Sequence, residues 1–441
     1  KLTSLVKNCK IHQTAIRVGV NHGSLSERIV SKYGDTAQGM TESAMEFIRI
    51  FKDLGFTNLV ISLKASNVLV MVDSNRLLIK KMKAENSFYP LHLGVTEAGN
   101  AEEGRIKSAL GIGSLLSEGI GNTIRVSLTE EAEYEIPVAK KIVEAALENQ
   151  WENDDFDLPI QYQRKESYGI YNIGNQQLPI VVNHQHNDHS SNLNADYIFD
   201  PASNSLTSTD QKNNLRNCNI EDLINSKLNS DQQYFLNIAP NQWTDQLIKS
   251  LVQSKNILLV IEKKDSITLT EIIQLLEKIE KNNISCPIIF RINCLKSNIE
   301  NLMIHASIIA APLLLAAKLD GIWIDSPTFS STEISFGILQ ASRQRISKTE
   351  YIACPSCGRT LFNIQKKLEE IKKETTDLVG LKIAIMGCIV NGPGEMADAD
   401  YGYVGAGPNQ VNIYKGHQII KKNVAEDEAT KVLLEIIRSE V

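Results

Sequence analysis

Three of the seven cysteines fall within a stretch of 35 residues near the C-terminus, where together they could hold a metal ion or an iron–sulfur cluster. Cys354 and Cys357 form a Cys-x-x-Cys pair just ahead of a predicted helix, whose positive N-terminal end stabilises thiolates. Cys388 follows a predicted strand and opens a glycine-rich turn that ends at Glu395. Glycine lets backbone N–H groups approach sulfur closely, and such hydrogen bonds tune a cluster's potential. No fourth cysteine is nearby, so Glu395 is the natural fourth ligand.

Two kinds of metal centre compete for these cysteines. Zinc would favour a Cys3His site, and His417 is the only histidine near them in the sequence, at an apparently solvated strand end. A [4Fe–4S] cluster held by three thiolates leaves one iron with an oxygen ligand. That ligand can be exchanged for a substrate, which suits catalysis better than simple electron transfer. The pattern therefore favours a cluster, and a zinc-stabilised binding or scaffold module without catalysis is the alternative.

A second group of charged residues lies at the ends of apolar strands in the first 150 residues. Arg17, Lys64 and Arg125 each lie on or at the end of such a strand, and Glu97 is the one carboxylate at the same ends. A buried cation needs an anionic partner. Three cations against one carboxylate therefore predict an anionic ligand such as a phosphate or diphosphate, unless the side chains turn outward into solvent. Glu97 itself fits a general acid or base, or alternatively a capping or salt-bridging residue.

The elements that must position these residues repeat as a strand followed by an amphipathic helix. The predicted strands are Ala15–Asn21, Leu59–Lys64, Leu91–Glu97 and Thr123–Thr129. The predicted helices are Thr41–Leu54, Val72–Ala84, Glu102–Ser117 and Pro137–Asn149. Near-continuous apolar strands alternating with helices are typical of a parallel sheet covered by helices. A (β/α) barrel places its active site at the C-terminal strand ends, and four units amount to part of a barrel.

The remainder of the chain divides into two further predicted domains. Residues 151–345 are rich in Asn and predict an α/β, barrel-like insert, for which we expect a structural role, with strands near Leu178–Val182, Tyr234–Ile238, Asn256–Ile261, Pro287–Ile292 and Gly321–Ile324. Within it we expect Asn204–Asn217 to be a loop. The run from His184 to His189 resembles a metal cluster, but its loose spacing favours a solvated loop. Residues 346–441 predict a small α+β domain that carries the three cysteines.

Composition excludes several classes of protein. The chain has 441 residues, 42% of them hydrophobic and 22% charged, which is ordinary for a globular protein. A net charge of -6 argues against a general nucleic-acid binder. The longest apolar stretch, Ala306–Ala317, is too short for a membrane span and contains Pro312. The sparse, odd-numbered cysteines indicate a reducing compartment.

These motifs, taken in order, resemble those of the 4-hydroxy-3-methylbut-2-enyl diphosphate synthase family. The stretches that carry the resemblance are RVGVN (17–21), VISLKAS (60–66), HLGVTEAG (92–99), CPSCGRTLF (354–362) and MGCIVNGPGE (386–395). These stretches are long and specific. The resemblance as a whole covers residues 15–150 and about 335–441. The middle of the chain resembles the extra domain of the larger, three-domain members. The resemblance implies a partial TIM-type barrel, the barrel-like insert and an iron–sulfur domain.

The family implies an oxidoreductase of isoprene and terpenoid biosynthesis, in the methylerythritol phosphate pathway. It would open the ring of 2-C-methyl-D-erythritol 2,4-cyclodiphosphate with two electrons and remove water. Cys354, Cys357 and Cys388 would hold a [4Fe–4S] cluster, with Glu395 on the fourth iron at rest until substrate oxygen displaces it. Glu97 would face the reacting carbons. The residues that would contact the diphosphate are Arg17, Asn21, Lys64 and Arg125, with Ser66 and Ser127 as minor contacts.

The resemblance also implies partners and a setting. Reduced ferredoxin or flavodoxin would donate the electrons, and neither nucleic acid nor a membrane is expected. The location would be the bacterial cytoplasm or the plastid stroma. A homodimer is one expected assembly, because in two-domain relatives the iron–sulfur domain of one chain caps the barrel of the other. A middle domain would instead let one chain close on itself. Further barrel strands precede this segment in the family, so we expect a longer parent protein.

Overall fold

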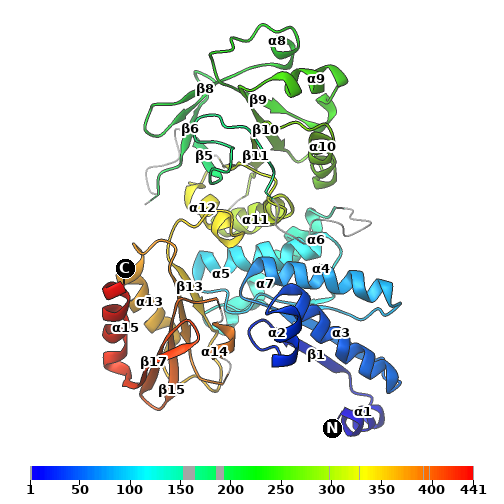
Figure 1. Cartoon of the computed structure of the whole chain (residues 1–441), viewed down its shortest axis with the longest axis vertical. Coiled ribbons are helices and arrows are strands. Elements are labelled where there is room, and N and C mark those ends of the chain that lie inside the picture. The colour runs from blue at the N-terminus through cyan, green and yellow to red at the C-terminus, as the bar shows by residue number, and fades with distance from the viewer. Residues whose placement is uncertain are drawn as a thin grey trace. The chain divides into compact units, whose positions relative to one another are not determined.

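The computed structural model describes residues 2–151, 164–184, 193–296, 298–326, 328–390, 392–396 and 398–440 (Figure 1). The chain folds into two compact units. One unit combines Lys1–Glu144 with Ile346–Val441, and the other is Ala145–Arg345. The two ends of the sequence therefore fold together, and the second unit is an insert between them. The predicted α/β fold with a barrel-like insert is confirmed.

The N-terminal part of the first unit is a run of strands and helices. Its elements are α1 (Leu2–Ile11), β1 (Ile16–Asn21), α2 (Glu27–Tyr33), α3 (Ala37–Asp53), β2 (Leu59–Lys64), α4 (Val68–Ala84), β3 (His92–Leu93), α5 (Ala101–Ser108), the π-helical turn η1 (Ala109–Gly113), α6 (Ser114–Ser117), β4 (Thr123–Ile124), η2 (Ala132–Tyr134) and α7 (Glu135–Glu148). The helices bury apolar stripes. Met40, Ala44 and Ile48 of α3 recur at helical spacing, and all three are fully buried.

The four strands of this part run parallel and side by side. β1 pairs with β2 so that Asn21 lies opposite Lys64. Isolated bridges join the β2 region to the next strand, and β3 pairs with β4. The predictions of full strands at Leu91–Glu97 and Thr123–Thr129 were wrong in length, because each regular strand is two residues long. The backbone then curves away from an extended path, and Glu97 itself has a left-handed φ of 48°.

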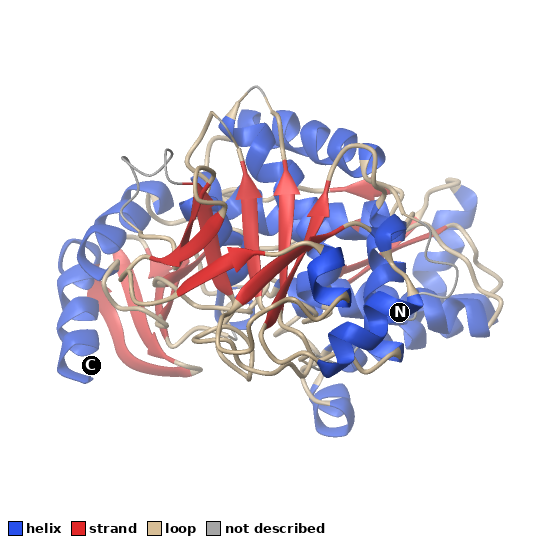
Figure 2. Cartoon of the chain, turned by 90° about the horizontal axis from the view of Figure 1, so that it is seen from above, coloured by secondary structure: helices blue, strands red, loops and turns tan. Residues whose placement is uncertain are grey.

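The insert is a closed eight-stranded barrel with the strand order β10-β11-β12-β5-β6-β7-β8-β9. Its strands are β5 (Ile180–His184), β6 (Tyr197–Asp200), β7 (Ser205–Ser208), β8 (Asn214–Asn217), β9 (Tyr234–Ile238), β10 (Ile257–Lys263), β11 (Ile288–Asn293) and β12 (Gly321–Asp325). All neighbours pair in parallel except β7, which is antiparallel to both β6 and β8. The helical elements are α8 (Ile220–Ile224), η3 (Pro240–Gln242), α9 (Asp245–Gln253), α10 (Leu269–Lys281), α11 (Ile299–Leu315) and α12 (Thr332–Ala341). Figure 2 shows strands in red flanked by helices in blue.

Two expectations for the insert were wrong. The segment Asn204–Asn217 is not a loop, because it contains β7 and β8, which close the barrel. His184 is not in a solvated loop either. It ends β5, and its side chain is 18% exposed. The remaining chemical residues of that motif, His186, Asp188 and His189, lie outside the described residues.

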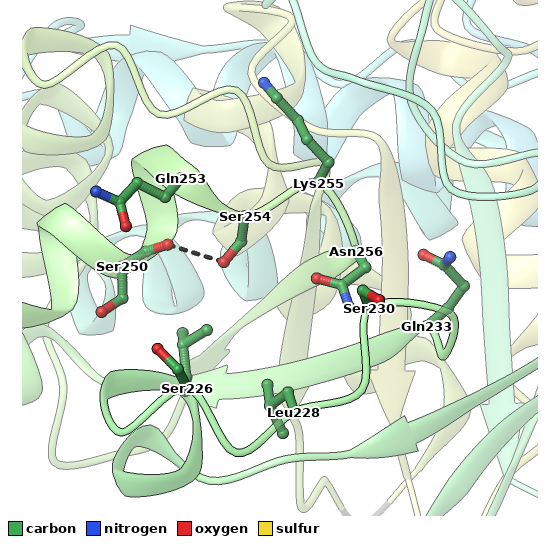
Figure 3. Close-up of a pocket in the computed structure, with 10 residues that line it drawn as sticks. Ser226, Leu228, Ser230, Gln233, Ser250, Gln253, Ser254, Lys255 and Asn256 are labelled. Carbon is green, nitrogen blue, oxygen red and sulfur yellow. Dashed lines mark hydrogen bonds between the residues drawn. The ribbon is translucent and has the colours of Figure 1, made fainter.

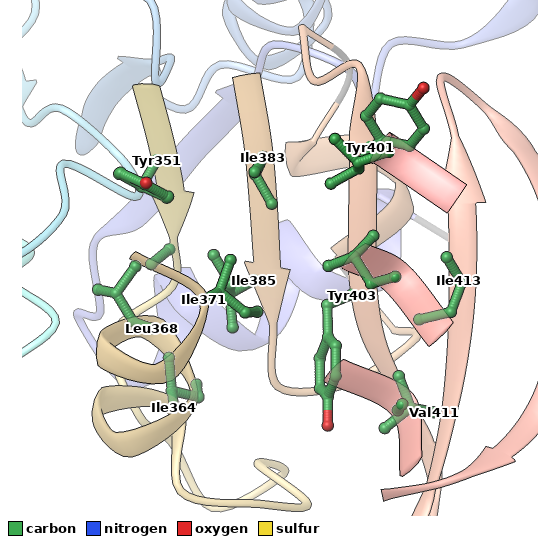
Figure 4. Close-up of a cluster of buried hydrophobic side chains, with 14 residues drawn as sticks. Tyr351, Ile364, Leu368, Ile371, Ile383, Ile385, Tyr401, Tyr403, Val411 and Ile413 are labelled. Carbon is green, nitrogen blue, oxygen red and sulfur yellow. The ribbon is translucent and has the colours of Figure 1, made fainter. Parts of the chain in front are cut away.

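The C-terminal part of the first unit is a five-stranded sheet in the order β13-β14-β15-β16-β17. Its elements are β13 (Glu350–Ala353), α13 (Ile364–Thr375), β14 (Lys382–Met386), α14 (Gly392–Glu395), β15 (Tyr401–Gly407), β16 (Gln410–Lys415), β17 (Gln418–Ala425) and α15 (Glu426–Glu440). The first three strands are parallel and the last two are antiparallel to their neighbours. Buried side chains of α13, including Leu368 and Ile371, pack against Ile383, Ile385 and Tyr403 of the sheet (Figure 4).

None of the described helices is both long enough and apolar enough to cross a membrane.

Candidate functional site

Of the predicted cations, Lys64 is buried at the end of β2, whereas Arg125 is exposed and Arg17 is exposed near the start of β1, opposite Val60. Asn21 and Lys64 lie opposite each other at the ends of β1 and β2. Ala65 bridges to Val95, and the backbone N–H of Arg125 donates to the carbonyl of Leu93 at 2.9 Å. Parallel strands end at one edge, so the side chains that follow them gather there. Ser66 is half-buried beside this edge and Ser127 is buried.

Lys64 is the most buried of the three cations, with 5% of its surface exposed. Burial, the neighbouring Arg125 and Arg17, in that order, lower the pKa of Lys64 to about 8, against a smaller opposing effect of Glu97. Among the described residues, no hydrogen bond or ion pair of the Lys64 ammonium is found. A glycine at position 94 makes room for it, because a Cβ there would lie 3.0 Å from Lys64 Cε. A buried ammonium that has no ion pair among the described residues and is repelled by nearby cations is the kind of group that an anion would stabilise.

His92 belongs to the same group, although the sequence singled it out only as part of a longer motif. Burial and the charges of Lys64, Arg17 and Arg125 lower its pKa to about 4. Its Nδ1 lies 2.7 Å from Thr123 Oγ1 on the neighbouring strand. The signal in the sequence was its place near the start of the predicted strand Leu91–Glu97, the segment that carries Glu97. It is therefore a neutral hydrogen-bonding group beside the cations.

Glu97 lies between the strand ends that carry Lys64 and the C-terminal part of the unit, because the next residue, Ala98, pairs with Ala353. Glu97 is 4% exposed, and its Oε2 has no hydrogen-bond partner within the described part of the chain. Burial and the adjacent Glu395 carboxylate raise the pKa of Glu97 well above its ordinary value. A left-handed φ in a non-glycine residue costs energy and persists only where the surroundings enforce it. The buried Glu97 carboxyl is therefore adjacent to Glu395 and near Arg125.

The cysteines lie at one end of two adjacent parallel strands. β13 and β14 pair with Ala353 opposite Ile385, and Cys354 directly follows the first strand. Cys388 comes two residues after the second strand, and the intervening Gly387 donates its N–H to Cys354 Sγ at 3.3 Å. Burial, above all, raises the pKa of Cys354 to about 12. The spacing in the sequence therefore becomes proximity, because both thiols follow neighbouring strands.

Cys357 is held in the turn between β13 and α13. Its backbone N–H donates to Thr360 Oγ1 at 2.9 Å, and this hydroxyl lies 3.8 Å from Cys357 Sγ. A hydrogen bond from the backbone of Arg359 lowers the pKa of the exposed Cys357 thiol. The neighbouring Leu361 donates its N–H to the carbonyl of Gly387 at 3.1 Å, which ties this turn to the one that carries Cys388.

Glu395 ends the short helix α14, which begins at Gly392 in the turn after Cys388. The Gly392 N–H donates to the Cys388 carbonyl at 3.3 Å. Gly394 packs against the loop that follows β1, because a Cβ at this position would lie 2.9 Å from the Gly23 carbonyl oxygen. A side chain at position 394 would push the Glu395 turn away from β1. Glycine here lets the Glu395 turn pack closely against the loop after β1.

The junction between the two parts of this unit is made by backbone and buried side chains. Ala98 forms a parallel bridge with Ala353, the residue before Cys354. Thr129 Oγ1 donates to the Ala353 carbonyl at 2.9 Å, and both groups are buried. Lys107 and Glu350 form a buried ion pair at 3.0 Å. The segment that carries Glu97 therefore continues the sheet that carries the cysteines.

The four predicted ligands match an iron–sulfur cluster by donor type. Three thiols and one carboxylate lie at the same end of the β13–β14 pair, and a backbone N–H already points at one sulfur. Among the described residues, no three His, Cys, Asp or Glu side chains are close enough to hold a metal ion. The ligand assignment therefore stays a prediction, based on donor type and strand topology.

The position of His417 in the structure excludes it as the fourth ligand of a Cys3His zinc site. His417 lies in the turn between β16 and β17 and is exposed. β16 runs antiparallel to β15, with Lys415 opposite Tyr401. The last residues of β16 therefore lie beside the first residues of β14 and β15. The cysteines follow the last residues of β13 and β14, at the opposite ends of the strands. A Cys3His site with His417 would need the sheet to unfold.

The comparisons with known proteins agree with this architecture. Residues 1–140 match the family described as the GcpE TIM-barrel domain, and residues 350–439 match the GcpE protein C-terminal domain. The chain is 40% identical to 4-hydroxy-3-methylbut-2-en-1-yl diphosphate synthase (flavodoxin) of Porphyromonas gingivalis, over 99% of this chain and 74% of the relative. It is 41% identical to the enzyme of the same name from Bacteroides thetaiotaomicron, over 98% of this chain and 75% of the relative. A chloroplastic (ferredoxin) synthase of Arabidopsis thaliana is 36% identical, over 99% of this chain and 69% of the relative.

The shifted pKa of Lys64 predicts how anion binding depends on pH. Sulfate remains a dianion from pH 6.5 to 9.5, so titration calorimetry across this range reports the protein groups. A bound anion favours the protonated amine, so affinity should be constant well below pH 8 and fall as pH rises through 8. The limiting slope is about tenfold per pH unit for one proton. His92, with a pKa of about 4, stays neutral throughout.

The control for this titration is Lys64→Met, which should bind sulfate more weakly and with a flat profile. An unchanged slope in that variant would show that another group is responsible.

Proposed function

The chain belongs to the 4-hydroxy-3-methylbut-2-en-1-yl diphosphate synthase family of isoprenoid biosynthesis, an iron–sulfur oxidoreductase family, and we propose that it reduces 2-C-methyl-D-erythritol 2,4-cyclodiphosphate. Two electrons and two protons convert this substrate to (E)-4-hydroxy-3-methylbut-2-enyl diphosphate and water. One carbon–oxygen bond to phosphate breaks as the ring opens, and one hydroxyl leaves as water. The observation that supports the proposal is the buried Lys64, which has no ion pair among the described residues and feels the charges of Arg125, Arg17 and Glu97, near the cysteine-bearing strand ends.

The cations account for the diphosphate part of the substrate. The charges of Arg125 and Arg17 act on the buried Lys64, and Asn21 lies opposite Lys64 in the strand register. In this proposal these four residues bind and orient the phosphates, with Ser66 and Ser127 as additional hydrogen-bond donors. The neutral His92 donates or accepts a hydrogen bond at the same edge. The charge that accumulates on the leaving phosphate is stabilised where the protein already concentrates positive charge.

The cysteines and Glu395 account for the reducing power. We assign Cys354, Cys357, Cys388 and Glu395 as the residues that hold a [4Fe–4S] cluster, which supplies two electrons one at a time. The Gly387 N–H stabilises negative charge on the Cys354 sulfur. Glu97 is the proposed proton donor, because its buried carboxyl adjoins Glu395 and comes close to Arg125. The Ala98–Ala353 bridge keeps this carboxyl at the cysteine-bearing edge and helps to exclude water.

The electron donor is the next element of the proposal. The bacterial relatives carry flavodoxin in their names, and the plant relative carries ferredoxin. We therefore propose a flavodoxin- or ferredoxin-type donor for this chain, in a cytoplasmic or stromal setting. Cys357 is exposed, so one edge of the assigned cluster site faces solvent in the part of the chain that is described. The cations and the cysteines come from one chain, so the site as proposed requires no second copy.

The cluster assignment predicts the metal content after anaerobic reconstitution. Iron and acid-labile sulfide should each approach about four per chain in the wild type. Cys388→Ser should lose most of both, while Cys218→Ser, a buried cysteine of the insert, should retain them. His417→Ala should also retain them, because that side chain lies at the other edge of the sheet. Zinc without sulfide, lost on changing His417, would establish the structural-metal alternative instead.

The role of Glu97 predicts a separation of turnover from cluster content. Glu97→Gln keeps the side-chain shape at a strained backbone position but removes the acidic proton, so kcat should fall by at least about 100-fold. Iron content and the visible absorption of the cluster should not change. The matched control is Glu133→Gln, an exposed residue of η2, which should retain activity. Full turnover in Glu97→Gln would remove this residue from the mechanism.

A further inference from the structure

The segment that carries Glu97 has a backbone that its own residues do not favour. Glu97 and Ala101 both have a left-handed φ of 48°, and Gly99 between them has a φ of 97°. A left-handed φ is unfavourable for glutamate and alanine, and it persists only where the surroundings enforce it. Contacts from outside the segment are therefore needed to hold it in this conformation.

One such contact comes from the N-terminal part of the same unit. The backbone N–H of Ala101 donates to Glu130 Oε1 at 2.6 Å. This bond ties the segment to the chain that follows β4, whereas the Ala98–Ala353 bridge is a backbone link to the cysteine-bearing sheet. A second link to that sheet comes from side chains at the start of α5.

Helix α5 lacks the cap that its sequence offers. Asn100 is the N-cap residue, and an asparagine at this position normally accepts a hydrogen bond from a backbone N–H of its own helix. The Asn100 side chain makes no such bond. Glu103, three residues later, has the place of the glutamate in a capping box, but without the Asn100 bond the box is incomplete. Both side chains have partners from a different part of the chain.

Lys372 of α13 is the partner that these two side chains share. Its ammonium donates to Asn100 Oδ1 at 2.7 Å and lies 3.4 Å from Glu103 Oε2. It also lies 5.0 Å from the ring centroid of Tyr351, which is buried in the cluster between α13 and the sheet (Figure 4). Tyr351 is on β13, the strand that leads to Cys354. One lysine therefore links the start of α5 to the cysteine-bearing strand.

A second lysine also pairs with Glu103. Lys348 Nζ lies 2.9 Å from Glu103 Oε1, so the carboxylate is held between two ammonium groups. Burial raises the pKa of Glu103, but the charges of Lys348, Lys372 and Lys107 outweigh this effect and leave the pKa below its ordinary value. Loss of Lys372 alone would leave Glu103 ionised and paired. It would release Asn100, which could then cap its own helix.

From this arrangement we propose that Lys372 is a positioning residue for the reaction, an inference that rests on the proposed role of Glu97. Its ammonium fixes the start of α5 against β13 and so holds the left-handed segment where the Glu97 carboxyl adjoins Glu395. The described contacts of Lys372 are not with residues assigned to bind substrate or the cluster. A displacement of about 1 Å can slow a reaction severely, so a contact outside the site can control kcat.

The variant Lys372→Met tests the proposal, because it keeps most of the aliphatic chain over Tyr351 and removes the ammonium. kcat should fall about tenfold, whereas KM for the cyclic diphosphate and the iron content should stay within about twofold. The melting temperature should not fall, because Asn100 can cap α5. Hydrogen exchange of the amides of residues 97–104 in the full chain should become faster, with or without the cluster.

A change at Asn100 removes the same contact from the other side. Serine is a good N-cap residue, but its hydroxyl is one bond closer to the backbone and does not reach Lys372. Asn100→Ser should therefore reproduce the loss of kcat, and the double variant should be no slower than either single variant. Asn100→Asp keeps an acceptor oxygen in the same place and should retain kcat.

The matched control is Lys255→Met in the insert. Lys255 also lies over a tyrosine, 5.1 Å from the ring centroid of Tyr168, and it lines a hollow of about 430 Å³ (Figure 3). This variant should leave kcat, KM and the exchange of residues 97–104 unchanged.

Three results would overturn the proposal: full turnover in Lys372→Met, a raised KM with kcat unchanged, or unchanged exchange of residues 97–104. A wild type that carries the cluster but does not turn over would contradict the proposed function and, with it, the role of Lys372 in the reaction. Unchanged exchange in a variant of an active wild type would contradict the positioning alone.

Discussion

The proposed chemistry depends on one junction, the bridge between Ala98 and Ala353. Ala98 directly follows Glu97, in the segment beside the strand-end cations. Ala353, its partner in the bridge, directly precedes Cys354. Backbone pairing fixes distance more tightly than side-chain contacts do, and the buried Thr129 hydrogen bond and the Lys107–Glu350 ion pair reinforce it. If this junction opened, the anion site and the cysteines would remain intact but would no longer form one site.

Much of this arrangement was predictable from the sequence, because the chemistry follows strand ends. Lys64 and Cys388 each come at or just after an apolar strand, and the parallel topology places such residues at a common edge. The insert barrel was also predictable from its apolar strands. The strands β7 and β8 were missed because Asn204–Asn217 is polar, and their role depends on neighbours that close the barrel. Local sequence does not contain that information.

The junction itself was not predictable, since Ala98 and Ala353 are separated by the whole insert. Small apolar residues carry no chemical signal, and their pairing is a property of the tertiary fold. The same holds for His92, whose importance comes from three charges supplied by other strands. His417 is the converse case. It is close to the cysteines in the sequence, but antiparallel pairing places it at the other edge of the sheet.

The two units differ in whether their buried charged side chains form ion pairs. The ammonium of Lys64 is buried with no ion pair among the described residues, and an anionic substrate would supply one. In the insert barrel, Asp325 pairs with Arg291, and Glu262 pairs with Lys264. The paired charges in the insert barrel therefore need no further anion, unlike the buried Lys64.

The central claim is that the anion site and the cysteine-bound cluster form a single site. The most direct measurement is pulsed EPR of the reduced, reconstituted protein with bound cyclic diphosphate, searching for phosphorus-31 hyperfine coupling to the cluster spin. The account predicts a resolved coupling in the wild type, and its loss in Lys64→Met, in which the cluster should remain. A protein that binds the diphosphate and carries the cluster without any coupling between them would contradict it.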